Sequence, residues 1–236
     1  MPETSDAKLE KEVAGRAGLK FVRDGDIVGL GTGSTAAYFV QALAERVQAG
    51  MKIRGIPTSS GTRDLAVSLG IPLTNFDELD KNDAQQIDVT IDGADEFDPQ
   101  LNLIKGGGGA LLREKIVASA SRQLVIVADS SKQVPVLGKF PLPVEVIPFA
   151  QALVAKKIEA LGAKTVKPRT SPDGRVFVTD EGHHILDCSF GLINDPAGLA
   201  RKLSDMPGIV EHGLFIGMTS VVLLARGDKV QELRKE

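Results

Sequence analysis

Short apolar runs alternate with amphipathic stripes through the first half of the chain. The runs predict strands, and the stripes, with apolar residues three or four positions apart, predict helices. Strands are expected at 27–30, 52–57, 87–91, 101–104 and 124–128, and helices at 8–22, 35–47, 110–120 and in a segment that ends at Gly70. Polar loops follow the strands, and this order favours a mainly parallel sheet in a doubly wound α/β domain.

The pattern changes after residue 139, and three prolines lie within 140–148. The elements expected from there are helices at 150–161 and 196–206 and strands at 164–169, 175–179, 185–189 and 209–214. Such an order is typical of a small α+β domain with an antiparallel sheet and two helices. The last apolar segment, 219–225, is expected to return to the first sheet.

Composition fits a globular protein with two such parts. The chain has 236 residues, of which 42% are hydrophobic and 25% charged, so it can bury a core. The expected domains are 1–137 plus 215–236 and 138–214. No apolar run approaches the ~18 residues of a membrane helix, and a net charge of −3 does not indicate a nucleic-acid surface. We therefore expect neither a membrane nor a nucleic acid as partner.

Cysteine usage bears on the compartment. The chain has one cysteine, Cys188, so no intrachain disulfide can form, and this favours a reducing environment. Beside Leu186 and Phe190, Cys188 is expected to be a buried small hydrophobe rather than a nucleophile. The polar N-terminal segment of mixed charge is unlike a signal peptide. We expect a cytoplasmic location.

A glycine- and hydroxyl-rich loop follows the first strand, at residues 29–35. A dinucleotide fingerprint fits poorly, because Ser34 stands where its third glycine would be and no acidic residue ends the second strand. A P-loop is excluded, because no Gly-Lys-Ser/Thr follows. Successive amides and hydroxyls at a helix N-terminus suit a phosphate or sugar hydroxyls. A glycine-rich turn with a capped helix is the alternative.

An acidic loop follows the strand at 87–91. Asp92, Asp95, Glu96 and Asp98 place four carboxylates within seven residues. Their mutual repulsion favours shifted pKa values, which would suit proton transfer or metal binding. A solvated acidic turn is the alternative.

Four consecutive glycines follow Lys105. Glycines are expected where the backbone passes close to a ligand or takes positive φ, and their amides, with Lys105, would form an oxyanion site. On a helical wheel Glu114 falls between Leu111, Val117 and Ala118. Apolar neighbours would raise its pKa and its strength as a base. A favourable acid at a helix N-terminus, or an ion-pair partner for a neighbouring cation, is the alternative.

A lysine and a pair of histidines are two further candidates for ligand binding. Lys132 follows the strand at 124–128 and could bind an anion at the same sheet edge, or be a solvated lysine. His183 and His184 are adjacent, so on a strand they face opposite ways and cannot both bind one ion. We assign both, and the distant His212, to packing or surface.

Four segments of the chain, taken together and in order, resemble the type A ribose-5-phosphate isomerase family. They are GTGSTA (31–36), DGADEFD (92–98), KGGGGALLREK (105–115) and ADSSKQVPVLGKFPLPVEVIP (128–148). The likeness covers nearly the whole chain. It implies a Rossmann-like domain with a small α+β lid domain, a homodimer or homotetramer, and no metal or other cofactor.

The resemblance also implies a reaction and its residues. D-ribose 5-phosphate and D-ribulose 5-phosphate would be interconverted, in the non-oxidative pentose phosphate pathway, by proton transfer through an enediolate. Glu114 corresponds to the family's base, and Asp92, Asp95 and Lys105 to its other catalytic groups. The substrate-binding positions implied are Lys11, Thr32, Gly33, Ser34, Thr35, Gly93, Ala94, Gly106, Gly107, Gly108 and Lys132.

Two other functions remain as rivals. A sugar-phosphate-sensing domain of a transcription regulator would need a DNA-binding module, and the residues before Ile27 predict only one helix. A nucleotide-dependent oxidoreductase would need the missing acidic residue after the second strand.

Overall fold

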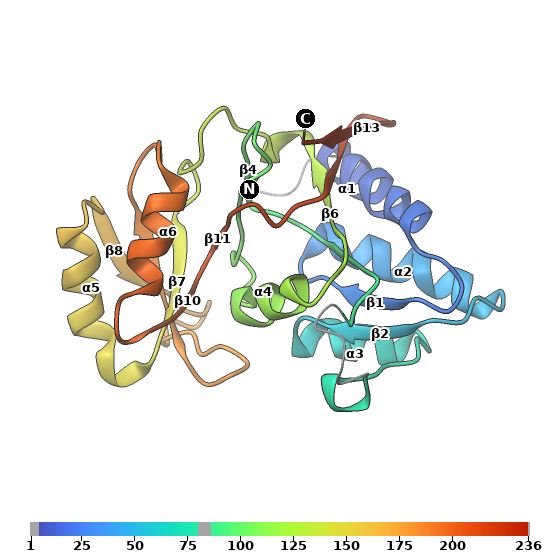
Figure 1. Cartoon of the computed structure of the whole chain (residues 1–236), viewed down its shortest axis with the longest axis horizontal. Coiled ribbons are helices and arrows are strands. Elements are labelled where there is room, and N and C mark those ends of the chain that lie inside the picture. Colours follow the sequence, from blue (N-terminus) through green and yellow to red (C-terminus); the bar gives the residue numbers. More distant parts are fainter. Residues whose placement is uncertain (1–4, 80–85, 236) are drawn as a thin grey trace. The chain divides into compact units, whose positions relative to one another are not determined.

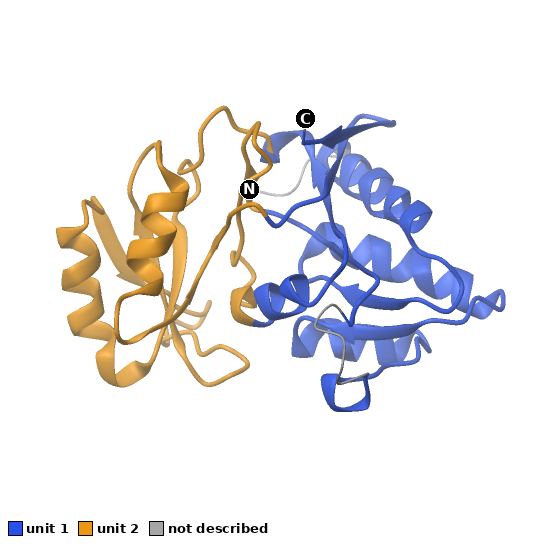
Figure 2. Ribbon diagram, in the orientation of Figure 1, with its two compact units in different colours: residues 1–94, 113–132, 218–236 blue, residues 95–112, 133–217 orange. Residues whose placement is uncertain are grey.

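The computed structural model of the chain describes residues 5–79 and 86–235. Two compact units are formed, each from several segments of the chain (Figure 2). Unit 1 comprises Met1–Ala94, Arg113–Lys132 and Met218–Glu236, and unit 2 comprises Asp95–Leu112 and Gln133–Gly217.

Unit 1 is built on a six-stranded sheet with the strand order β13-β12-β6-β3-β1-β2 (Figure 1). Neighbouring strands pair in parallel, except β12 and β13, which form an antiparallel hairpin. Its strands are β1 (Ile27–Leu30), β2 (Arg54–Pro57), β3 (Val89–Asp92), β6 (Leu124–Asp129), β12 (Val221–Arg226) and β13 (Lys229–Arg234). Its helices are α1 (Ser5–Ala17), η1 (Gly18–Phe21), α2 (Ser34–Gln48), α3 (Ser60–Ser68), η2 (Phe76–Glu78), α4 (Leu111–Ser119, whose first two residues belong to unit 2) and η3 (Ser130–Lys132).

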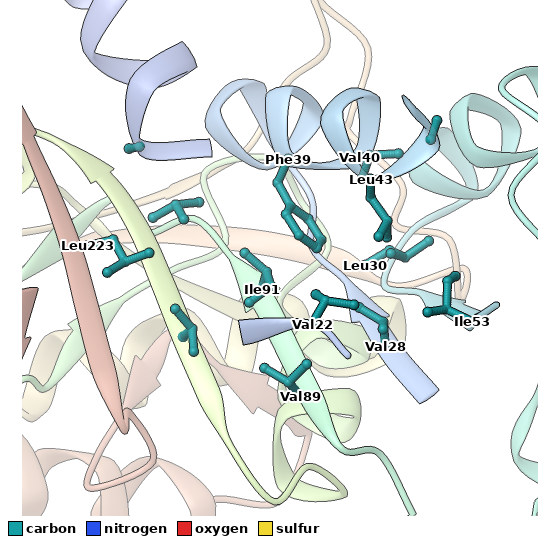
Figure 3. Packing of buried hydrophobic residues seen from close by; sticks show 14 of the residues in the cluster. Val22, Val28, Leu30, Phe39, Val40, Leu43, Ile53, Val89, Ile91 and Leu223 are labelled. Carbon is teal, nitrogen blue, oxygen red and sulfur yellow. The ribbon is translucent and has the colours of Figure 1, made fainter. Parts of the chain in front are cut away.

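Helices cover both faces of this sheet. On one face, Phe39 and Leu43 of α2 pack onto Leu30 of β1 and its neighbours (Figure 3), and α1 and α3 contribute Ala14 and Ala66 to the same cluster. On the other face a smaller cluster is formed by Ile56, Leu79, Ile87 and, from α4, Val117. Alternate residues of a strand face opposite ways, so strands buried on both faces are apolar throughout, as the sequence of β6 shows.

Unit 2 contains a four-stranded antiparallel sheet, β10-β7-β9-β8, and a three-stranded antiparallel sheet, β11-β5-β4. Its strands are β4 (Glu96–Phe97), β5 (Leu103–Ile104), β7 (Leu142–Val146), β8 (Thr165–Pro168), β9 (His184–Ser189), β10 (Ile209–His212) and β11 (Leu214–Phe215). Its helices are η4 (Pro148–Ala150), α5 (Gln151–Ala160) and α6 (Pro196–Ser204). One core cluster joins α5, α6 and one face of the larger sheet, through Val154, Leu203, Val144 and Cys188.

The fold class expected from the sequence is confirmed. A mainly parallel sheet with helices is accompanied by a smaller antiparallel sheet with two α-helices. The segment expected to return to the first sheet does so as β12, which lies between β6 and β13 and pairs in parallel with β6. The longest helix of residues 5–79 and 86–235 has 15 residues, and none of these helices is long and apolar enough to cross a membrane.

The strand expected at 175–179 is wrong. Only two isolated bridges occur there, Thr170 with Val176 and Val178 with His184. Both valines are largely exposed, 43% and 55%, so the alternating pattern does not mark a face packed on the core. The strand expected at 209–214 is divided at Gly213, where the chain passes from the larger sheet of unit 2 to the smaller one.

The domain boundaries expected from the sequence, 1–137 plus 215–236 and 138–214, remain a prediction. The compact units differ from them mainly at Asp95–Leu112, which joins unit 2 although it precedes residue 138. Its strand β5 pairs with β11 of unit 2, and β4 pairs with β5, so neither belongs to the large sheet.

The thiol of Cys188 should not react with thiol reagents in the folded protein. Burial of its thiol raises the pKa to about 12, so at pH 8 only about one molecule in 10⁴ carries the reactive thiolate. We expect native protein to resist a disulfide-forming aromatic reagent for hours, followed by absorbance, and protein unfolded in guanidinium to react at once. Labelling of native protein at the rate of a small thiol would contradict the placement of Cys188 in the core.

Candidate active site

The loop after β1 brings backbone and side-chain groups of unit 1 together. The amide of Thr32 donates to Oδ1 of Asp92 at the end of β3, at 3.1 Å. Gly31 has to be a glycine here, since a Cβ would lie 2.4 Å from the same carboxylate oxygen. Helix α2 begins at Ser34, and Gly33 and Ser34 are exposed. Its free N-terminal amides therefore lie beside Asp92's loop, in the arrangement that binds anions.

Three threonine hydroxyls behind this loop form a directed network. The Thr58 hydroxyl donates to the carbonyl of Leu30 at 3.0 Å, and the Thr62 hydroxyl donates to the carbonyl of Gly31 at 3.0 Å. The hydroxyls of Thr58 and Thr62 use their single hydrogens on these carbonyls, so Thr32 Oγ1 can donate to only one of them, Thr58 Oγ1 at 2.7 Å or Thr62 Oγ1 at 3.2 Å. Thr32 Oγ1 therefore offers a ligand only its lone pairs, which suit a sugar hydroxyl better than a phosphate oxygen.

A pocket of about 220 Å³ adjoins this network. Its lining consists of backbone, hydroxyl and aliphatic groups: Gly31, Thr32, Gly33, Ala37, Val40, Ser59, Gly61, Thr62 and Leu65. The supporting residues after β2 were not among the candidates from the sequence. The signal that could have found them is their hydroxyl-rich stretch, Thr58-Ser59-Ser60-Gly61-Thr62, which follows the strand next to β1.

Asp92 and Glu114 are the candidate catalytic carboxylates of unit 1, and both are buried. Asp92 is 1% exposed, and its Oδ1 also accepts the amide of Gly93 at 2.7 Å. Glu114, in the first turn of α4, is 4% exposed. The apolar setting read from the helical wheel is confirmed, because Leu111, Val117 and Ala118 are all buried.

A glutamate missed by the sequence interpretation organises the two candidate lysines of unit 1. Glu10 of α1 accepts the amide of Ser130, in the turn that carries Lys132, and the amide of Gly227, each at 2.9 Å. Its partial burial raises the pKa, but these amides and the charge of Arg226 outweigh this and hold the pKa below its usual value. Lys11 and Lys132 thus lie on elements that Glu10 ties together. The sequence offered no signal for Glu10 beyond its place beside Lys11.

The candidates Asp95, Lys105 and Gly106–Gly108 lie in unit 2. Asp95 accepts the amide of Gly107 through Oδ2 at 2.7 Å, and its own amide donates to the carbonyl of Ile104. Lys105 is 2% exposed, with its ammonium 5.6 Å from the centre of the Phe215 ring. Gly107 and Gly108 are exposed, so a ligand can reach their backbone.

The chain passes between the units inside the two motifs that carry the chemistry. Ala94 belongs to unit 1 and Asp95 to unit 2, and the second passage falls between Leu112 and Arg113 in α4. Within unit 1 the structure links Thr32 to Asp92, and within unit 2 it links Asp95 to Gly107.

The histidines have separate partners. His183 Nδ1 lies 3.0 Å from Oε1 of Glu145, and His184 Nδ1 lies 2.6 Å from the side-chain oxygen of Gln151. The two adjacent rings therefore contact different side chains. Burial raises the pKa of Glu145, although the hydrogen bonds from Thr179 and His183 lower it in part. In residues 5–79 and 86–235 no three His, Cys, Asp or Glu side chains are grouped so as to hold a metal ion.

Known proteins resemble this chain over its whole length. The family profile described as "Ribose 5-phosphate isomerase A (phosphoriboisomerase A)" matches residues 54–229. A ribose-5-phosphate isomerase A of Bradyrhizobium diazoefficiens is 52% identical over 237 residues, which cover 97% of this chain and 96% of the relative. The chain belongs to the ribose 5-phosphate isomerase A family.

Solved structures of the family agree. Ribose 5-phosphate isomerase A from Methanocaldococcus jannaschii has a TM-score of 0.89 and 39% identity, with 98% of this chain and 100% of that chain covered. A D-ribose-5-phosphate isomerase in complex with phospho-erythronic acid has a TM-score of 0.91 and 36% identity, with 97% and 99% covered. Family membership favours the isomerase over the sensor domain and the nucleotide-dependent oxidoreductase.

Replacing Thr58 by valine should expose the role of the hydroxyl network. Thr58→Val keeps the shape of the fully buried side chain but removes the hydroxyl that Thr32 Oγ1 contacts at 2.7 Å, while the carbonyl of Leu30 still accepts the backbone amide of residue 58. We expect the free energy of unfolding in urea to fall by about 0.5–1.5 kcal/mol. The exposed Thr165 offers a control, and Thr165→Val should change stability by less than about 0.5 kcal/mol. Equal stability of the two variants would argue against the network.

Proposed function

We propose that this member of the family interconverts D-ribose 5-phosphate and D-ribulose 5-phosphate, with Glu114 as the base that moves a proton between C2 and C1. The observation that carries the proposal is the burial of Glu114, 4% exposed, in the first turn of the helix that follows the glycine run. A carboxylate shielded from water by Leu111 and Val117 is the kind of group that abstracts a proton from carbon.

The names of the relatives support the substrate. The Bradyrhizobium relative is a ribose-5-phosphate isomerase A, and a structural neighbour was solved with phospho-erythronic acid. This acid combines a phosphate with a planar carboxylate, whose two oxygens resemble those of an enediolate. The same ligand is therefore a suitable probe for binding without turnover.

Asp92 is the candidate for opening the sugar ring and moving protons between O1 and O2. Its carboxylate is oriented by the amides of Thr32 and Gly93, which leaves its direction little freedom. Asp95 would assist it, and the hydrogen bond from Gly107 orients Asp95 in turn.

Negative charge develops on the sugar oxygens as the enediolate forms. The candidates for stabilising it are the ammonium of Lys105 and the amides of Gly106 and Gly108, because the amide of Gly107 donates to Asp95. Preorganised donors of this kind stabilise a transition state more than a ground state, because they need no rearrangement as charge appears. The burial of Lys105, 2% exposed, supports a role for its charge in a site with little water.

The phosphate would be held by charges and amides of unit 1. Lys132 and Lys11 supply positive charge, and the amides of Ser34 and Thr35 stand at the N-terminus of α2. The hydrogen of the Thr32 hydroxyl is used within the protein, which makes this group an acceptor for a sugar hydroxyl. Phosphate contacts of this kind orient the reacting carbons relative to the base.

We also propose, from the family resemblance, a cytoplasmic homodimer or homotetramer that needs no metal, with a smaller domain acting as a lid over the substrate. The single buried cysteine, Cys188, is compatible with a reducing compartment.

Replacement of the base tests the proposal directly. Glu114→Gln keeps the side chain's size but removes its basic oxygen, so we expect kcat to fall about 10²–10⁴-fold. Binding of phospho-erythronic acid, followed by titration calorimetry, should persist. Glu159→Gln, at an exposed glutamate of α5, should leave kcat unchanged. An active Glu114→Gln enzyme would show that another group is the base.

Deuterium from the solvent distinguishes proton transfer from a hydride shift. A proton carried by Glu114 can exchange with water, whereas a hydride shift keeps the hydrogen on the substrate. In D₂O, ribulose 5-phosphate made from ribose 5-phosphate should carry deuterium at C1, detected by NMR, and a chelator should leave the rate unchanged. Unlabelled product, or loss of activity on chelation, would contradict the proposed mechanism.

A further inference from the structure

An arginine that is distant in sequence from the motifs forms hydrogen bonds with the glycine run. Arg169, directly after β8, donates from one terminal nitrogen to the carbonyl of Gly106 at 2.7 Å and to that of Gly107 at 3.2 Å. Its other two nitrogens donate to the two carboxylate oxygens of Asp187, at 3.0 and 2.5 Å. One guanidinium thus bridges strand β9 and the glycine run, all within unit 2.

This guanidinium is held from several directions. The side chains of Arg169 and Asp187 are only 13% and 28% exposed. The amide of Arg169 donates a hydrogen bond to the carbonyl of Ile185, and its carbonyl accepts one from the amide of Phe177. The ring of Phe177 lies 5.9 Å from the guanidinium carbon. A bidentate pair in such a setting has a fixed geometry that lysine cannot reproduce.

The glycine run itself has little to fix it. Gly106 and Gly109 have φ of +103° and +81°, and the amide of Gly109 donates to the carbonyl of Gly106. A Cβ on Gly109 would lie 2.4 Å from the Phe177 ring, so Phe177, whose amide donates to the carbonyl of Arg169, packs closely against the turn. Glycines rotate their peptide planes more freely than other residues. The orientation of those planes therefore depends on groups outside the run.

The planar peptide links the orientation of each carbonyl held by Arg169 to the orientation of the amide that follows it. In a trans peptide the C=O and the following N–H point in opposite directions. Holding the carbonyl of Gly106 toward Arg169 turns the amide of Gly107 away from it, and that amide does donate to Asp95. Holding the carbonyl of Gly107 turns the amide of Gly108, an exposed residue, in the same way. A cation on the carbonyl side also polarises the peptide and strengthens the amide as a donor.

We propose that Arg169, oriented by Asp187, is a positioning residue for the isomerisation. It sets the peptide planes of the glycine run so that the Gly107 amide orients Asp95 and the Gly108 amide is aimed at the charge that develops on the sugar. The inference rests on the proposed function, in which Asp95 assists proton movement and amides of the glycine run stabilise the enediolate.

The kinetic signature follows from this role. The amides act on charge that appears in the transition state, so their misalignment lowers kcat and leaves KM nearly unchanged. Loss of one oxyanion donor costs about 10²–10³-fold, and donors that are displaced rather than deleted should cost about 10–100-fold. A purely structural ion pair would instead lower stability without this division.

The test compares three variants with a matched control. Arg169→Met removes the charge and should lower kcat most. Arg169→Lys and Asp187→Asn keep part of the arrangement and should be intermediate. Arg175 is 86% exposed and paired with Asp173, and it lies between β8 and β9 like Arg169. As the matched control, Arg175→Met should keep kcat within about twofold.

A second measurement does not depend on turnover. In protein labelled with ¹⁵N-glycine and free of ligand, the amide resonances of Gly107 and Gly108 should shift in the Arg169 and Asp187 variants and stay in place in Arg175→Met. Should Arg169→Met not fold, Arg169→Lys and Asp187→Asn carry both measurements. If none of the three folds, the pair is structural and the inference is overturned.

The outcomes separate this inference from the proposed function. A wild-type protein that does not isomerise ribose 5-phosphate, or an active Glu114→Gln variant, contradicts the proposed function. A wild type that is active, with an inactive Glu114→Gln and folded Arg169 variants whose kcat stays within twofold, overturns the positioning role alone. A rise in KM without a fall in kcat overturns it as well.

Discussion

Parallel pairing of β1 with β2 on one side and β3 on the other is the constraint on which unit 1 depends. Strands that run the same way end at the same edge of a sheet, and the chain order reverses around β1, which opens a crevice at that edge. The register places Leu30 beside Ile91, so the residues that follow, Gly31 and Asp92, meet directly. The hydrogen bond from Thr32 to Asp92 is a consequence of this backbone arrangement.

Three of the proposed catalytic side chains are buried. Asp92 and Glu114 in unit 1 are 1% and 4% exposed, and Lys105 in unit 2 is 2% exposed, although removing ionisable groups from water is unfavourable. Such groups are retained where their chemistry depends on limited solvation. The supporting layer follows the same logic: Thr58 and Thr62 direct the hydroxyl of Thr32, and backbone amides direct Asp92. Thr32 and Asp92 are thereby oriented by neutral groups.

The glycine run is oriented differently, because the groups proposed to act there are backbone amides. A side chain can be oriented by its rotamer and its packing, whereas a glycine peptide has to be held at its own oxygen. Arg169 does this at Gly106 and Gly107, and Asp187 holds Arg169. The flexibility that lets the chain pass close to a ligand therefore requires a restraint from a separate segment of unit 2.

The sequence by itself determined the fold class, most elements and the candidates Asp92, Asp95 and Glu114, because strand period, helical period and motif spacing are local properties. It also determined the burial of Glu114, since a helical wheel needs only neighbouring residues. The role of Glu10, the hydroxyl network around Thr32, and the grip of Arg169 on the glycine run were decided by tertiary structure alone. In each of these a side chain bonds to backbone or hydroxyl groups from 26 to 217 positions away, and no local pattern encodes such a partner. The strand wrongly expected at 175–179 has the same cause: its alternation is local, whereas pairing depends on which neighbour the fold supplies.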